Sequence, residues 1–132
     1  MEAAVAASEH RLVRLHDAHE VNGWLLIGFN ALAGVACLVA YRWSALRGRT
    51  IWTIVIVAQL TTFVQATLGT VLFRRPGVER NDMHALYGFS AIIAVAIMYS
   101  YRTSPFMKGK ELLLYGAGSL FVMGLGLRNL VL

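Results

Sequence analysis

Charged side chains are absent from four long stretches of the chain, and this segregation constrains the fold more than any other feature. The four stretches are residues 21–41, 51–73, 85–101 and 112–127. A helix needs about 20 largely apolar residues to cross the hydrocarbon core of a bilayer. The sequence therefore predicts an all-α integral membrane four-helix bundle. Its four transmembrane helices are expected at roughly 18–43, 51–73, 83–102 and 111–131.

The whole chain, residues 1–132, is expected to form a single domain. Only 14% of its residues are charged, against about a quarter in an ordinary soluble domain. Residues 1–17 are expected to form either an N-terminal surface helix or a helical lead-in to the first span. None of the four stretches carries a charged group near mid-membrane, which argues against an energy-coupled exporter.

The net charge of +5 does not indicate a nucleic-acid partner, because the basic residues lie in short loops beside helix ends. Six lie on the side of the first and third loops: Arg42, Arg47, Arg49, Arg102, Lys108 and Lys110. The other six are Arg11, Arg14, Arg74, Arg75, Arg80 and Arg128. The first group has one acidic neighbour and the second has six. This split favours cytoplasmic first and third loops, with both termini outside a bacterial or archaeal plasma membrane.

Two of the predicted helices begin with the same pattern, His-x-x-x-Gly. The first copy is His19 with Gly23, and the second is His84 with Gly88. The first and third helices run in the same direction, so both histidines are expected at one depth. Two imidazoles that face each other across a bundle core can bind a haem iron, and a glycine one turn away leaves space for a macrocycle. We therefore expect one haem b with bis-histidine ligation.

Polar residues of the neighbouring segments fit the same hypothesis. Gln65 lies on the polar face of the second helix, and it is expected to line the site together with Asn30. Three arginines, Arg74, Arg75 and Arg80, flank the loop before His84. Arginine pairs with carboxylates through a bidentate fork, so these side chains are expected to bind haem propionates. Ordinary interfacial anchoring is the alternative role for them.

Other occupants of the site remain open at this point. His16 lies three residues before His19 and could replace it as the ligand. His16, His19 and Glu20 could instead join His84 in a zinc or copper site, because imidazole and carboxylate suit both metals. The remaining alternative is that no cofactor binds, and that the histidines are hydrated near the membrane surface.

A short motif resembles the last part of the haem A synthase family. The residues that carry the resemblance are Gln65-x-x-Leu68-Gly69, then Pro76, then His84. The family also has an earlier helix opened by a histidine, which His19 resembles. The resemblance covers about residues 16–101 and corresponds to one four-helix half of a two-half fold. It implies that His19 and His84 are paired axial haem ligands near the outer side of the membrane. The chain lacks a second half and the outer-loop cysteine pair.

The expected function is that of a membrane b-type haem protein, in electron transfer or in haem handling linked to respiration. One alternative is a half-length haem A synthase-like oxidoreductase. Another is a cofactor-free accessory subunit of a larger membrane complex, such as a respiratory one. The expected partners are the lipid bilayer, a larger membrane complex or a second copy of the chain packed on the glycines of the last helix, and a quinone.

Overall fold

The computed structural model describes residues 1–74 and 82–130 of the chain. Within these residues the structure contains four long helices and two short 3₁₀ turns, and no strand. The helices are α1 (Glu2–Arg42), α2 (Arg49–Phe73), α3 (Asp82–Tyr101) and α4 (Glu111–Leu130). All four are long and apolar enough to cross a membrane. The predicted all-α fold is confirmed, and these helices make the chain an integral membrane protein.

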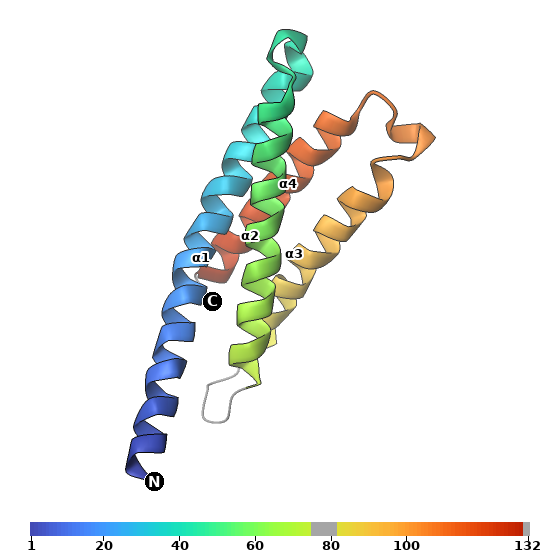
Figure 1. The fold of residues 1–132 in the computed structure, drawn as a ribbon. Helices are drawn as coiled ribbons and strands as arrows, with labels where there is room; N and C mark the ends of the chain where they lie inside the picture. The colour runs from blue at the N-terminus through green and yellow to red at the C-terminus, as the bar shows by residue number, and fades with distance from the viewer. Residues whose placement is uncertain (75–81, 131–132) are drawn as a thin grey trace.

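The helix ends agree with the sequence-based ranges to within two residues, except at the start of α1. Residues 2–17 continue α1 without a break, so the lead-in is part of one helix of 41 residues. At about 1.5 Å per residue such a helix is about 60 Å long, twice the thickness of a bilayer core. Figure 1 shows the N-terminal part of α1 projecting beyond the other helices. His19 therefore lies inside α1, and the prediction that it begins a helix is wrong. His84 lies in the first turn of α3, as expected.

Arg47 closes the C-terminal end of α1. Its Nε donates to the carbonyl of Ala40 and its Nη2 donates to the carbonyl of Tyr41, both over 2.9 Å. The last carbonyls of a helix have no partner within the helix, and a basic side chain can satisfy them. Arg47, one of the basic residues of the first loop, thus also stabilises the turn into α2.

The helices are not packed equally against one another. α1 packs extensively against both α2 and α4, whereas α3 packs mainly against α4 and less against α2. α1 and α3 therefore lie across the bundle from each other. Figure 1 shows the α1–α2 and α3–α4 connections at one end of the bundle, and the N-terminus at the other. As a result, α2 and α3 pack less closely against each other than α1 and α4 do.

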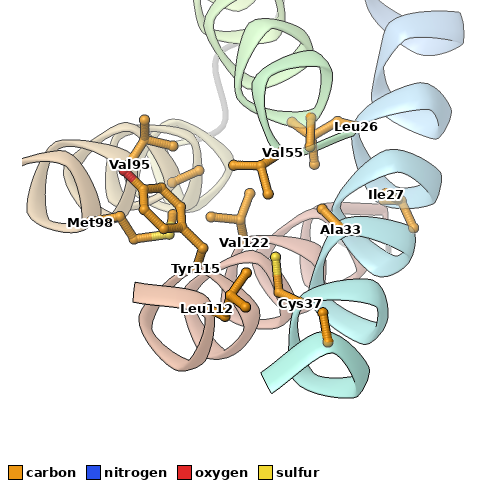
Figure 2. Close-up of a cluster of buried hydrophobic side chains, with 13 residues drawn as sticks. Leu26, Ile27, Ala33, Cys37, Val55, Val95, Met98, Leu112, Tyr115 and Val122 are labelled. Atoms are coloured by element: carbon orange, nitrogen blue, oxygen red, sulfur yellow. The ribbon is translucent and has the colours of Figure 1, made fainter. Parts of the chain in front are cut away.

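The middle of the bundle is closed by small and medium-sized apolar side chains. Cys37, Val55 and Val122 point into the space between the helices (Figure 2), and Val95 and Tyr115 extend this cluster towards α3. Cys37 is fully buried, so it serves as a small apolar packing residue.

Glycines bring α1 and α4 into close contact. A methyl group at Gly34 would lie 2.6 Å from Leu120 Cγ and 3.1 Å from the carbonyl oxygen of Gly116. Gly116, Gly118 and Gly126 of α4 are all covered by side chains of the chain itself, whereas Gly124 faces open space. These three glycines therefore allow close contacts within the bundle. Three of the four are therefore not available as a surface for a second copy.

The α1–α4 contact can be tested with a matched pair of alanine substitutions in α1. We expect Gly34→Ala to destabilise the protein by about 1–3 kcal/mol, because overpacking forces neighbouring side chains and backbone to move. Gly28→Ala is the control, since nothing lies within 4 Å of the methyl group it would add. The free energies are measured by reversible unfolding in mixed micelles, followed by circular dichroism. Equal stability of the two variants would contradict the packing described here.

Candidate functional site

All four helices contribute to a cavity of about 940 Å³ at the end of the bundle that holds the start of α3. This volume lies near the upper end of the range for ligand sites, about 300–1,000 Å³. Every predicted site residue that the structure describes lines it, except Asn30. The lining includes His16, His19, Glu20, Gly23, Gln65, Gly69, Arg74, His84, Gly88 and Asn129.

The two histidines meet across this cavity. The ring centroids of His19 and His84 lie 5.8 Å apart, and their planes are inclined by 52°. They come from α1 and α3, the two helices that lie across the bundle from each other. The prediction that both imidazoles lie at one depth and face a common space is confirmed. Leu and Phe side chains do not separate them.

The spacing of the rings is suitable for a haem. Two imidazoles that bind one iron from opposite faces, each through a bond of about 2 Å, place their ring centres about 6 Å apart. The observed separation is 5.8 Å. The half-buried rings are therefore at the distance that bis-histidine ligation needs, on the wall of a cavity large enough for a cofactor.

Gly69 has a role that the sequence did not reveal. A methyl group at this position of α2 would lie 3.1 Å from His19 Nε2. The missing side chain thus lets the imidazole of His19 pack closely against α2. Gly69 belongs to the short motif that resembles the haem A synthase family. Its contact with His19 depends on the rotation of α2 about its axis, which the sequence does not specify.

The two glycines of the His-x-x-x-Gly pattern differ in what surrounds them. A methyl group at Gly88 would meet nothing within 4 Å, so this glycine leaves open space beside His84. A methyl group at Gly23 would lie 3.1 Å from Gln65 Nε2. The space that was expected to admit a macrocycle at Gly23 is thus taken up by an amide side chain. Only the Gly88 half of that expectation agrees with the structure.

A polar contact between α1 and α2 holds Gln65 in place. Asn22 Nδ2 donates to Gln65 Oε1 over 3.0 Å and to the carbonyl of Thr61 over 2.8 Å. Both hydrogens of the Asn22 amide therefore have acceptors. Asn22 was not identified from the sequence, although an amide at membrane depth is a signal for an interhelical hydrogen bond.

Asn30 does not line the cavity, and the expectation that it would is wrong. Its side chain is 1% exposed, and its Nδ2 bonds to Thr62 Oγ1 and to backbone carbonyls at Leu26 and Ala58. It lies between α1 and α2, about two helical turns along α1 from Asn22, which contacts Gln65. Asn30 therefore joins these two helices and closes the inner end of the site.

Asn129 of α4 contacts the start of α3. Its Nδ2 donates to the carbonyl of His84 over 3.2 Å. Its Oδ1 is shielded from solvent and has no hydrogen-bond partner among the residues that the structure describes. A shielded amide oxygen beside a cavity can accept a bond from a polar ligand group. Asn129 could not be identified from the sequence, where it stands out only by its place in the last turn of a span.

The remaining candidates are distributed around the cavity mouth. Arg74 follows α2 and lines the cavity, whereas Arg75 and Arg80 lie outside the described residues. His16 and Glu20 are exposed but also line the cavity. Across residues 1–74 and 82–130, no group of three or more His, Cys, Asp or Glu side chains is arranged to hold a metal ion. A haem needs only two protein ligands, whereas the zinc or copper alternative needs more and stays a prediction.

Comparison of the chain with protein-family models, with curated proteins and with solved structures gave no match. The resemblance to the haem A synthase family therefore depends on the short motif around Gln65 and Gly69. Any functional conclusion has to be drawn from the geometry of the site itself.

The contact between Asn22 and Gln65 can be measured by a double-mutant cycle. We expect Asn22→Ala and Gln65→Ala each to lower the stability, and the double variant to lose less than the sum of the two. Hydrogen bonds between membrane helices have coupling energies of about 0.6 kcal/mol on average and up to about 1.7 kcal/mol. The readout is reversible unfolding in mixed micelles. Strictly additive losses would show that the two amides do not interact.

Proposed function

We propose that the chain is an integral membrane haem protein in which His19 and His84 hold one b-type haem between α1 and α3. The observation that carries the proposal is the pair of imidazoles, 5.8 Å apart, on the wall of a cavity of about 940 Å³. Paired histidines on facing helices of a bundle are a common way to build such a site. Solvated histidines with no ligand would not need to meet inside the bundle.

The surrounding residues have distinct roles in this proposal. Gly69 lets the His19 ring pack against α2, and Gly88 leaves open space beside His84. Gln65, held by Asn22, offers a polar side chain to the cavity wall. Arg74 stands at the cavity mouth and is placed to pair with a propionate, because its guanidinium offers two parallel donors. Arg75 and Arg80 keep their predicted propionate role as part of the proposal.

The ligand set favours electron transfer over oxygenation. A haem bound by two histidines supplies one-electron redox chemistry, and its potential is set by the axial ligands and the polarity around them. When two side chains of the protein occupy both axial positions, no position is open for a substrate. Catalytic metal sites keep such a position open. We therefore propose electron transfer, or haem handling, linked to a respiratory chain, over a haem A synthase-like reaction.

The basic loops orient the protein in this proposal. Arg42, Arg47, Arg49, Arg102, Lys108 and Lys110 lie at the end of the bundle opposite the cavity. The other side carries as many basic residues but six acidic ones, so the net positive charge lies at this end. Positively charged segments are retained preferentially on the cytoplasmic side. We propose that the α1–α2 and α3–α4 connections are cytoplasmic, in a bacterial or archaeal plasma membrane. Both termini and the haem site then lie near the outer face.

An optical spectrum of the purified full-length protein tests the haem site. We expect a Soret band that His19→Ala and His84→Ala each abolish, since each removes one axial ligand. His16→Ala is the matched control, because this histidine lines the same cavity in the same helix, and it is expected to keep the band. Circular dichroism confirms that the variants are folded.

Other results would identify the alternatives. A protein that stays colourless after reconstitution with haem would contradict the proposal and favour an accessory subunit. Bound zinc or copper, detected by mass spectrometry in the colourless protein, would favour the metal site. Haem o or haem a in the solvent extract would favour the synthase-like enzyme. Loss of the band in His16→Ala and not in His19→Ala would move the ligand to His16.

The proposed propionate contact of Arg74 predicts a small and salt-dependent effect. We expect Arg74→Gln to weaken haem binding about two- to fivefold, because exposed ion pairs contribute little. The difference should shrink in 1 M salt, where charges are screened over about 3 Å. Haem affinity is measured by absorbance titration of the haem-free protein. Arg102→Gln, at the opposite end of the bundle, is the control and should bind haem as the unmodified protein does.

A further inference from the structure

A second hollow lies on the outer surface of the bundle, away from the histidines. It is a groove of about 780 Å³ between α3 and α4. Its walls are Ile93 and Ile97 of α3 and Leu113 and Phe121 of α4, all of which are exposed. The small side chain of Ala117 forms part of the floor. The groove is thus an apolar furrow on a lipid-facing surface.

A lysine closes one end of this groove. Lys110 lines it at the point where the α3–α4 connection enters α4, and its Nζ lies 5.3 Å from the ring centroid of Phe106. Arg102 and Lys108 lie in the same connection. The one carboxylate nearby, that of Glu111, accepts a hydrogen bond from the backbone amide of Gly109. The end of the groove is therefore positively charged, and none of the acidic residues in 1–74 and 82–130 lines the groove.

The length of the groove corresponds to one leaflet. From Lys110 to Phe121 along α4 the helix rises about 16 Å, at about 1.5 Å per residue. Half of a hydrocarbon core about 30 Å thick is about 15 Å. An acyl chain whose headgroup lies at the level of Lys110 would therefore end near Phe121, where the groove ends. A transmembrane helix of a partner would need a surface that continues through both leaflets.

From this combination we propose that the groove binds one acyl chain of an anionic phospholipid, whose headgroup phosphate pairs with Lys110. The apolar walls accommodate the chain and the lysine selects the charge of the headgroup. Basic residues beside membrane helices attract anionic lipids. The site is independent of the histidine cavity, since it involves none of its ligands and lies at the opposite end of α3 and α4.

Native mass spectrometry of the full chain, released from mixed phosphatidylglycerol and phosphatidylcholine micelles, tests this proposal. We expect one phosphatidylglycerol to be retained with about fivefold preference over phosphatidylcholine. Lys110→Gln should abolish the preference, because it removes the charge. Ala117→Phe should reduce retention of both lipids, because the ring fills the groove without changing any charge. Arg49→Gln is the control, since it removes a charge on the same membrane side outside the groove.

Each contrary result has a definite meaning. Equal retention of the two lipids, or a full preference in Lys110→Gln, would overturn the proposal. Loss of the preference in Lys110→Gln combined with normal retention in Ala117→Phe would also overturn it, because the lipid would then bind through its headgroup alone. An equal loss in Arg49→Gln would indicate general attraction to a basic surface, which contradicts a single site.

Discussion

The absence of water in the bilayer core is the constraint on which this structure depends. A polar group that is not paired within the protein has no solvent partner there, and leaving it unpaired costs several kcal/mol. α2 satisfies this constraint in two ways. Its exposed threonines, such as Thr67 and Thr70, donate to carbonyls one turn earlier in the same helix. Its inward Gln65 and Thr62 pair with asparagines of α1. The polar face of α2 is therefore the surface that joins it to α1.

Unequal packing explains why the cavity exists. Gly34 and Gly116 allow α1 and α4 to approach closely, and the asparagine contacts hold α2 against α1. α3 packs mainly on α4, so the bundle stays open between α1, α2 and the start of α3. Small residues such as Gly69 and Gly88 widen this opening where larger side chains would fill it. The histidine pair lies at this opening because α1 and α3 run in the same direction across the bundle.

The sequence predicted the spans and the depth of the histidines, but not the contacts around them. Charge segregation determines which residues cross the membrane, and helix direction determines which helix ends share a leaflet. The rotation of α1, α3 and α4 about their axes is less constrained, because the membrane-spanning parts of these helices are apolar on nearly all sides, and a polar face on α2 does not specify its individual contacts. For this reason the contact of Gly69 with His19, the pairing of Asn22 with Gln65, and the bond from Asn129 could not be predicted. The sequence left open whether residues 1–17 form a separate surface helix or a helical lead-in, because their charges mark a membrane boundary and do not end a helix; the structure has the lead-in.

The two proposed ligands are held in different ways, and this difference follows from the corrected start of α1. His19 lies inside a continuous helix, with hydrogen-bonded turns on both sides, so its backbone position is set by α1 as a whole. His84 lies in the first turn of α3, where backbone groups lack helical partners and turns are held less firmly. Asn129 adds a second attachment, because its Nδ2 donates to the His84 carbonyl from α4, which itself is packed against α1 through Gly126. Both imidazoles are thus positioned relative to the same helix, α1, one directly and the other through α4.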